Sequence, residues 1–187
     1  MMTTSINKNL LSLLFIILFI PLASCNGQIS DDGKDLPAND PEGIQWMSFE
    51  DAVKLSEKNP KKIFIDVYTS WCGWCKKMDA TTFKEADVVK FINANFYPVK
   101  LNAETKDTIH FRGKDYKYVT DYKANELALS LLSGKMGYPS YVLLDEEFSL
   151  LTPPIQSYLE KKDLMPVITF YGSNIYKTKT WDEYVKK

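Results

Sequence analysis

Histidine and cysteine are both scarce in this sequence, which has one histidine and three cysteines among its 187 residues. Two of the cysteines, Cys72 and Cys75, lie close together in the stretch TSWCGWCKKMD, whereas Cys25 lies near the N-terminus and His110 lies well downstream. A closed structural zinc site needs about four protein ligands, usually from two such cysteine pairs. The shortage of ligands therefore argues against a zinc site, and we expect no metal.

The short spacing of Cys72 and Cys75 also argues against a purely structural disulfide. A disulfide that closes a loop of about four residues constrains the unfolded chain far less than one that closes a long loop. Cys25 has a separate assignment, given below, so these are the only two thiols expected in the folded domain. A redox-active pair is the interpretation that remains.

An excess of charge of one sign is also lacking, because 23 lysines and arginines nearly balance 24 aspartates and glutamates, for a formal net charge of −1. The sequence has no stripe of basic residues interleaved with aromatic residues. Nucleic-acid binding normally relies on such a positive field. We therefore expect no nucleic-acid partner, and we expect a monomer.

The chain has one long apolar run, LLSLLFIILFIPLA, which lies in the N-terminal segment after Lys8. At about 13 apolar residues, this run is shorter than the ~20 that a membrane-spanning helix needs. It fits the apolar region of a signal peptide instead. Residues 1–24 are therefore predicted to be a signal peptide, and the mature protein to be exported.

The end of this run, LASC at residues 22–25, resembles the lipobox of bacterial lipoproteins, whose cysteine is lipidated and becomes the first mature residue. The resemblance implies that a lipid on Cys25 anchors the protein to the inner or outer membrane of the cell envelope, facing the periplasm or the cell surface. The alternative is an ordinary signal peptide that ends by chance on a cysteine. Residues 25–43, which are polar and rich in Gly, Pro, Asn and Asp, are predicted to be a flexible tether.

The first half of the remaining chain predicts alternating helices and strands. A helix is expected within residues 47–62, capped by Ser48 with Asp51 three positions later and ended by Pro60. The run KIFIDVYTS predicts a buried strand that Asp66 interrupts, and helical spacing follows the cysteine pair before a second strand, FYPVKLNAE. Strand, helix and strand in this order predict a right-handed βαβ unit.

The second half predicts a hairpin, a helix, two strands and a closing helix. The hairpin is expected within residues 107–119, with its turn at Arg112 to Asp115. A helix within residues 125–137 precedes a core strand at 138–145. An edge strand is expected at residues 149–158 because its prolines cannot donate to a central ladder. A closing helix is expected at residues 160–172, although Pro166 would break this helix unless the proline lies in its first turn. Residues 173–187 are a C-terminal extension for which no structure is predicted.

The segment IDVYTSWCGWCKKM, followed by GYPSYVLLD, resembles the thioredoxin superfamily, and in particular thioredoxin-like envelope lipoproteins of Bacteroidetes-type bacteria. The resemblance covers residues 44–172, which are expected to form one domain. It implies an α/β fold of the thioredoxin type, with a central mixed β-sheet flanked by helices. The hairpin region, residues 104–123, is an insertion relative to a minimal thioredoxin.

The resemblance also implies roles for individual residues. Cys72 corresponds to the attacking cysteine, Cys75 to the resolving cysteine, Pro139 to the cis-proline that faces them, and Asp66 to the buried carboxylate below the pair. The dipeptide between the cysteines departs from the family pattern, because Trp74 replaces the proline of thioredoxin. The reduction potential of this pair is therefore open.

Elementary chemistry leads to compatible roles. A thiol at a helix N-terminus is stabilised as the thiolate by unpaired backbone N–H groups, which suits Cys72 as nucleophile. Cys75, one turn further in, is close enough to attack the mixed disulfide, and it must first lose a proton. Asp66 is placed to accept that proton if burial raises its pKa. The alternative is a strand-end aspartate held by the backbone or by Lys76.

Substrate binding is predicted for the residues that flank the two thiols. Trp71, Gly73 and Trp74 lie beside the cysteines, and the tryptophans either offer an apolar platform to the substrate or pack against the domain. A cis-proline at 139 would leave the backbone of Tyr138 open to pair with a substrate strand. Lys76 and Lys77 either stabilise the thiolate or form a solvated face, and His110 is given no role.

The sequence thus predicts a membrane-tethered thiol-disulfide oxidoreductase that reduces disulfides of exported, cysteine-containing proteins. Its expected redox group is the Cys72–Cys75 disulfide itself, without a further cofactor. A reductase outside the cytoplasm needs electrons from across the membrane, so a membrane thiol electron donor is an expected partner. Isomerase and oxidase remain alternatives, since one dipeptide does not fix the potential. A peptide-binding module without turnover is the alternative from another class.

Overall fold

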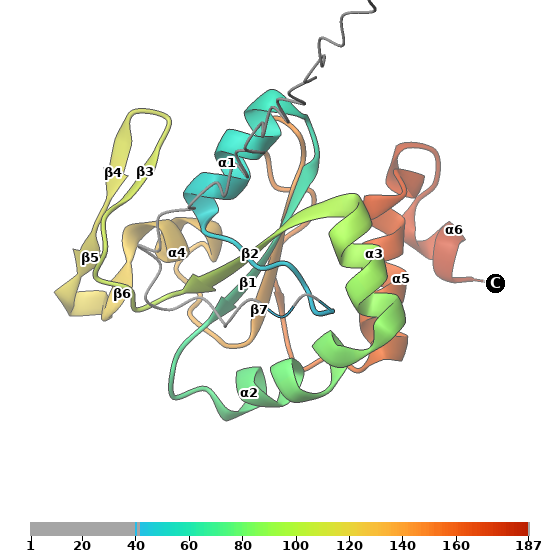
Figure 1. Cartoon of the computed structure of the whole chain (residues 1–187), viewed down its shortest axis with the longest axis horizontal. Coiled ribbons are helices and arrows are strands. Elements are labelled where there is room, and N and C mark those ends of the chain that lie inside the picture. The colour runs from blue at the N-terminus through green and yellow to red at the C-terminus, as the bar shows by residue number, and fades with distance from the viewer. Residues whose placement is uncertain (1–39, 41, 187) are drawn as a thin grey trace, which may run out of the picture. The chain divides into compact units, whose positions relative to one another are not determined.

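A four-stranded sheet with strand order β2-β1-β7-β8 lies at the centre of the fold in this computed structural model, which describes residues 40 and 42–186 (Figure 1). Its strands are β1 (Lys62–Tyr68), β2 (Phe96–Asn102), β7 (Ser140–Leu144) and β8 (Ile155–Gln156). β1 pairs parallel with β2 and antiparallel with β7, and β8 pairs antiparallel with β7. The predicted mixed sheet is confirmed. The predicted signal peptide and Cys25 lie outside the described residues, as does nearly all of the predicted tether.

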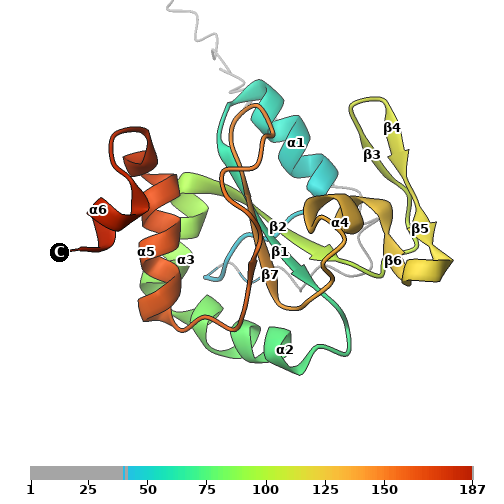
Figure 2. The ribbon, with the colours of Figure 1, turned by 180° about the vertical axis from the view of Figure 1, so that it is seen from behind.

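Alternate residues of the central strand β1 face two separate apolar clusters. The first cluster joins the sheet to α1 (Phe49–Lys58) and α4 (Glu126–Leu131). The second joins it to α2 (Gly73–Ala80), α3 (Ala86–Asn95) and α5 (Lys161–Gly172). Helices therefore cover both faces of the sheet (Figures 1 and 2), which explains why β1 reads as a nearly continuous apolar run.

Helix α1 begins and ends where its sequence signals predict. The hydroxyl of Ser48 accepts a hydrogen bond from the Asp51 N–H at 3.1 Å and donates one to the Asp51 carboxylate at 2.7 Å. The helix ends at Lys58, two residues before Pro60. The capping residues and the proline thus fix both ends of the element that leads into β1.

The predicted hairpin is present, with a tighter turn than expected and a second ribbon after it. β3 (Ile109–Phe111) pairs with β4 (Lys114–Tyr116) through a two-residue turn at Arg112 and Gly113, both with positive φ. A further pair, β5 (Tyr118–Val119) with β6 (Ala124–Asn125), was not predicted. Strands of two residues are too short to show an alternating pattern.

Two predicted element lengths in the second half were wrong, whereas the helix predicted at residues 160–172 is confirmed as α5. Helix α4 stops at Leu131 because Ser133 and Gly134 adopt positive φ, so the chain leaves the helix there. The edge strand β8 is confirmed as an edge but has only two residues. Helix α5 passes through Pro166, its sixth residue, without breaking. Burial of its apolar face, through Leu164 and Ile168, outweighs the backbone hydrogen bond that the proline cannot donate.

The C-terminal extension is folded against the rest of the domain. A 3-10 turn (Ile175–Lys177) and α6 (Trp181–Val185) follow α5, and α6 lies beside that helix (Figure 2). Phe170 of α5 makes ring contacts with four aromatic residues: Tyr171, Tyr176, Trp181 and Tyr184. No structure was predicted for this segment from the sequence.

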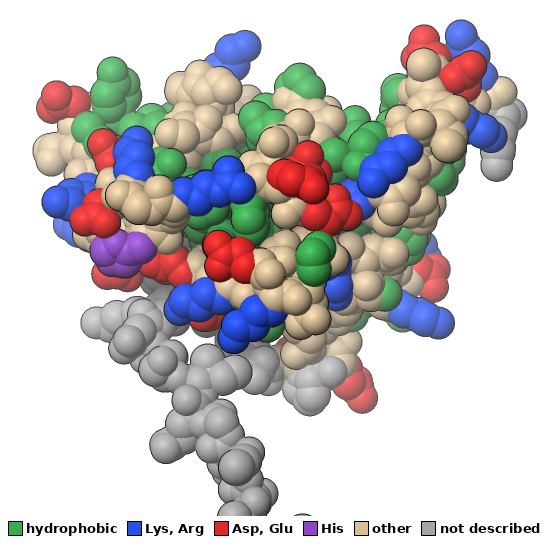
Figure 3. Space-filling view, turned by 90° about the horizontal axis from the view of Figure 1, so that it is seen from above, with side chains coloured by type: hydrophobic (Ala, Val, Ile, Leu, Met, Phe, Trp, Pro, Cys, Tyr) green, Lys and Arg blue, Asp and Glu red, His purple; other side chains and the backbone are tan. Residues whose placement is uncertain are grey.

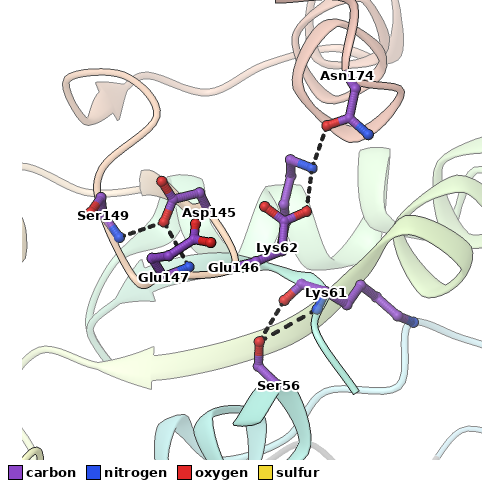
Figure 4. Close-up of polar contacts among 8 residues, drawn as sticks. All are labelled: Ser56, Lys61, Lys62, Asp145, Glu146, Glu147, Ser149 and Asn174. Carbon is purple, nitrogen blue, oxygen red and sulfur yellow. Dashed lines mark hydrogen bonds and ion pairs between the residues drawn. The ribbon is translucent and has the colours of Figure 1, made fainter. Parts of the chain in front are cut away.

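A buried lysine connects the extension to the start of the central strand (Figure 4). The ammonium of Lys62 lies 2.8 Å from a carboxylate oxygen of Glu146 and 2.7 Å from the amide oxygen of Asn174. Only 3% of the Lys62 side chain is exposed. A charge buried this deeply needs such partners, so the contact holds the extension against the sheet.

On the face seen in Figure 3, which views the molecule from the top of Figure 1, acidic and basic side chains are interspersed among apolar ones. This pattern agrees with the nearly balanced composition. Across residues 40 and 42–186, none of the helices is both long and apolar enough to cross a membrane.

Candidate active site

Cys72 and Cys75 form a disulfide at the N-terminus of α2, directly after the loop that follows β1. Their Cα atoms are 5.3 Å apart. Cys72 is the N-cap residue, and its Sγ accepts a hydrogen bond from the Cys75 N–H at 3.0 Å. The predicted position of the pair at a helix start is confirmed. An N–H aimed at the first sulfur would stabilise a thiolate there after reduction.

Tyr138 contacts Trp71, the residue before Cys72, although the two are distant in sequence. The Tyr138–Pro139 peptide bond is cis, as the resemblance implied. The rings of Trp71 and Tyr138 are 5.8 Å apart in an edge-to-face contact, which brings the residue before Cys72 against the residue before Pro139. Burial, together with the Glu104 carboxylate, raises the pKa of Tyr138 to about 12, so its hydroxyl stays protonated.

Asp66 is completely buried in β1 and lies on the same face of the sheet as Phe64, which is the face that α2 covers. Cys75 and Met78 form the buried face of α2 toward this side. Burial raises the pKa of the Asp66 carboxyl above its ordinary value, while the charge of Lys100 acts in the opposite direction and Asp79 adds to the rise. A carboxyl with a raised pKa is a better proton acceptor than an ordinary aspartate, so Asp66 is suited to exchanging a proton with Cys75.

The partner of Asp66 is Lys100 of β2, and not Lys76 as the alternative interpretation had it. The Lys100 ammonium donates to Asp66 Oδ2 at 2.6 Å and also binds the carboxylate of Asp79 in α2. Asp66 Oδ1 has no hydrogen-bond partner among the described residues. Burial works against the charge of Lys100, but the two carboxylates outweigh it and raise the pKa of Lys100. The ammonium therefore remains charged.

Neither Lys100 nor Asp79 was predicted from the sequence to belong to the site. Lys100 interrupts the apolar strand FYPVKLN in the same way that Asp66 interrupts β1, so a lysine and an aspartate in neighbouring buried strands were the available signal. The register pairs these two residues directly. Asp79 follows Cys75 by one helical turn, which places both on one face of α2. Its side chain is 43% exposed, so the chain of charges runs from the buried aspartate to the surface.

Both predicted tryptophans are exposed, which favours a binding platform over packing within the domain. Trp71 is 65% exposed and its indole N–H donates to Glu104 Oε1 at 2.9 Å. Trp74 is 57% exposed and contacts the ring of Tyr158. Gly73 is exposed between the cysteines, with open space where a Cβ atom would lie. One exposed tryptophan thus precedes Cys72, and a second lies between the two cysteines.

His110 lies outside this group of residues. It is exposed on the β3–β4 hairpin, and its Nδ1 is 2.7 Å from a carboxylate oxygen of Asp115. In the part of the chain that the structure describes, no group of three or more His, Cys, Asp or Glu side chains is arranged to hold a metal ion.

Comparison with known proteins gives a family and a fold. The model of the Thioredox_DsbH family, described as "Protein of unknown function, DUF255", matches residues 35–170. A relative from Archaeoglobus fulgidus, an uncharacterized protein, is 33% identical over 63 residues, or 34% of this chain and 50% of its own length. The chain spans half or less of the length of the curated relatives it matches.

Solved structures agree on the fold. The DsbH oxidoreductase has a TM-score of 0.50 at 19% identity, and the match covers 76% of this chain and 95% of that one. A thioredoxin-fold protein from Helicobacter pylori has a TM-score of 0.53 at 15% identity, covering 68% and 84%. The chain therefore belongs to the Thioredox_DsbH family, and it has a thioredoxin fold that carries a disulfide between Cys72 and Cys75.

Proposed function

We propose that this protein is a thiol-disulfide oxidoreductase that reduces disulfides in exported proteins. One observation carries the proposal: the Cys72–Cys75 disulfide caps α2, whose buried face turns toward the buried carboxylate of Asp66. A nucleophilic sulfur, a second sulfur one turn away and a proton acceptor are the groups that dithiol exchange requires.

The proposed reaction begins with the reduced pair. The Cys72 thiolate attacks one sulfur of a substrate disulfide, which forms a mixed disulfide and expels the other substrate sulfur as a thiolate that takes up a proton. Cys75 then gives its proton to the Asp66 carboxylate and attacks the Cys72 sulfur, which releases the second substrate thiolate. Two electrons pass from the protein to the substrate, and the protein ends as the Cys72–Cys75 disulfide.

Renewal of the dithiol requires a reductant outside the chain. We assign this role to a membrane thiol electron donor, whose own dithiol is oxidised as the Cys72–Cys75 disulfide is reduced. The neighbouring residues Trp71, Gly73 and Trp74 would hold the substrate chain, together with the Tyr138–Pro139 segment. No cofactor other than the disulfide enters this scheme.

The direction of the reaction distinguishes the alternatives within this class. An isomerase would use the same first attack but leave the substrate oxidised, and an oxidase would start from the Cys72–Cys75 disulfide and end with the dithiol. A peptide-binding module would use the surface around the disulfide without turnover. The completeness of the Cys72, Cys75 and Asp66 arrangement favours a catalyst over such a module.

The test is reduction of insulin by the chain from residue 25 onward, carrying Cys25→Ser so that only two thiols remain. With dithiothreitol as electron donor, we expect turbidity from precipitating insulin chains well ahead of the uncatalysed reaction, and no acceleration with Cys72→Ser. Equal rates with and without the protein would contradict the proposed activity. Refolding of scrambled ribonuclease A in a glutathione redox buffer, without dithiothreitol, separates an isomerase from a reductase.

Attachment to the envelope membrane through a lipid on Cys25 is a separate part of the proposal. Cells that express the full-length chain and receive a labelled fatty acid should incorporate the label into the wild type and not into Cys25→Ser. Fractionation should then move the Cys25→Ser chain from the membrane to the soluble fraction. Label in both forms would contradict the assignment.

A further inference from the structure

A cluster of one tryptophan, one tyrosine and one lysine lies beside the disulfide, and we call Trp74, Lys77 and Tyr158 the Trp74 platform. The ring centres of Trp74 and Tyr158 are 5.4 Å apart. The Lys77 ammonium lies 4.8 Å from the centre of the Trp74 ring and 4.7 Å from that of Tyr158. The platform therefore offers an apolar surface and a positive charge within one contact distance of each other.

The parts of the Trp74 platform are held in place by their own elements. Trp74 and Lys77 lie three positions apart on α2, so their side chains lie on the same side of the helix. The Tyr158 hydroxyl is 3.2 Å from the hydroxyl of Thr81, the residue that ends α2. Because Tyr158 is tied to the helix that carries Cys72, the platform keeps a fixed position relative to the reacting sulfur.

The exposure of its side chains indicates that the Trp74 platform does more than pack against the core of the domain. Trp74 is 57% exposed, whereas an aromatic residue that serves the core is normally buried. Lys77 is exposed and makes no ion pair within residues 40 and 42–186. Its charge is thus available to a partner, while its aliphatic stem covers part of the aromatic surface.

The two tryptophans next to the cysteines have neighbours of opposite charge. The exposed Lys77 ammonium lies over the Trp74 ring. The Trp71 indole N–H binds the Glu104 carboxylate. A polypeptide that crosses the disulfide would therefore meet a positive group beside one tryptophan and a negative group beside the other.

Beyond Tyr158 the surface is hollowed, so an extended partner has room to continue. A cavity of about 490 Å³ is lined by Thr81, Thr82, Glu85, Tyr158, Glu160, Lys161 and Lys162. Lys161 is paired with Asp87 at 2.6 Å, and Lys162 with Glu160 at 3.0 Å. This part of the surface thus adds space, while the free charge belongs to Lys77.

We infer that the Trp74 platform binds the segment of a protein substrate next to its reacting cysteine, and that it prefers segments with an acidic residue beside an apolar one. The apolar side chain would cover the rings of Trp74 and Tyr158, and the carboxylate would pair with Lys77. The inference rests on the proposed function, because it concerns the substrate of the same reaction. Charges at the edge of an interface act mainly on the association rate and weaken with salt.

The experiment measures the first attack alone, with the chain from residue 25 carrying Cys25→Ser and Cys75→Ser. The substrates are short peptides with one cysteine, joined by a disulfide to thionitrobenzoate, and with Glu-Phe, Glu-Ser, Gln-Phe or Lys-Phe placed before or after the cysteine. Attack by Cys72 on the peptide sulfur forms the protein–peptide disulfide and expels coloured thionitrobenzoate. Second-order rate constants follow from the absorbance.

For one of the two placements, the Glu-Phe peptide should react about 3- to 10-fold faster than the Lys-Phe peptide at low salt, as expected for an exposed charge pair and its repulsive counterpart. Lys77→Glu should reverse this preference, and Trp74→Ala should remove the advantage of Phe over Ser. The matched control is Lys58→Glu, which makes the same change in net charge at an exposed position at the end of α1. Lys58→Glu should leave the ratio of the Glu-Phe and Lys-Phe rate constants unchanged.

The ratio of the rate constants of the Glu-Phe and Lys-Phe peptides is the decisive quantity. Loss of Lys77 can also make the Cys72 thiolate less stable, but this would slow the reaction of all peptides equally. Ready reaction of every peptide with the same rate constant, unaffected by Lys77→Glu, would overturn the inference while leaving the proposed function in place. No reaction of any peptide with the protein would overturn both.

Discussion

Lys100 donates a hydrogen bond to the buried carboxylate of Asp66 across the parallel pair of strands β1 and β2, with 2.6 Å between Nζ and Oδ2. Burial and the nearby Asp79 raise the pKa of Asp66, and the charge of Lys100 lowers it. The balance of these opposing effects decides at which pH the carboxyl below the disulfide takes up a proton. Three variants test this balance.

Replacing Asp66 by Asn keeps the shape of the side chain and removes its proton exchange. We expect Asp66→Asn to leave the first attack by Cys72 nearly unchanged and to slow release of the mixed disulfide by about 100-fold near neutral pH, the lower end of the typical contribution of a general base. Stopped-flow measurement of both steps checks this. Equal release rates in the two proteins would make Asp66 a structural carboxylate.

Changes at Lys100 and Asp79 should move the pH dependence of release in opposite directions. Lys100→Met removes the charge that lowers the pKa of Asp66, so the carboxyl should lose its proton at a higher pH. The profile of release rate against pH should therefore shift to higher pH than in the wild type. Asp79→Asn removes a charge that raises this pKa, so the profile should shift to lower pH. Shifts of both profiles in the same direction would contradict the assignment.

Stability should depend on pH through the same group. Because the pKa of Asp66 is higher in the folded than in the unfolded chain, its contribution favours the folded state at acidic pH and is lost as the pH rises through the folded pKa. Lys100→Met leaves the ionised carboxylate less compensated, so it should cost about 3–5 kcal/mol at the alkaline end and less in acid. Urea unfolding at several pH values measures this. A loss that grows toward acidic pH would contradict it.

Gly172 lies where α5 meets α3 and β2. A Cβ atom at this position would lie 2.9 Å from ring carbons of Phe91 and Phe96, of which Phe96 is fully buried. Gly172→Ala should therefore lower the free energy of unfolding by about 1–3 kcal/mol, as overpacking does elsewhere. Gly73→Ala is the matched control, since open space surrounds that position. Equal stability of the two variants in urea would show that the rings move aside readily.

The parts of the site that local sequence patterns specify were predicted well. A capped helix, an apolar strand, two cysteines at the next helix start and a proline before a third strand are each visible within a few residues. Asp66 was predicted as a site residue because a carboxylate within an apolar, buried strand is unusual and indicates a specific role. Lys100 offered the same signal, but its pairing with Asp66 depends on the register between two strands that the sequence does not state.

The parts that depend on tertiary packing were not predicted. Tyr158 meets Trp74 only because the segment before α5 returns to the end of α2. Pro166 is tolerated because the apolar face of α5 is buried, and the aromatic contacts of Phe170 hold α6 in place. Patterns within a window of sequence carry no information on such contacts between distant segments.

The measurement that tests the central claim most directly is capture of substrates by the Cys75→Ser variant in cells. Without Cys75 the first attack still occurs and the second cannot, so Cys72 should remain joined to its substrates. After acid quenching and non-reducing separation, mass spectrometry should find exported, cysteine-containing proteins linked to Cys72, and none with the double variant Cys72→Ser and Cys75→Ser. Absence of any adduct at Cys72 would contradict an oxidoreductase and favour the peptide-binding module.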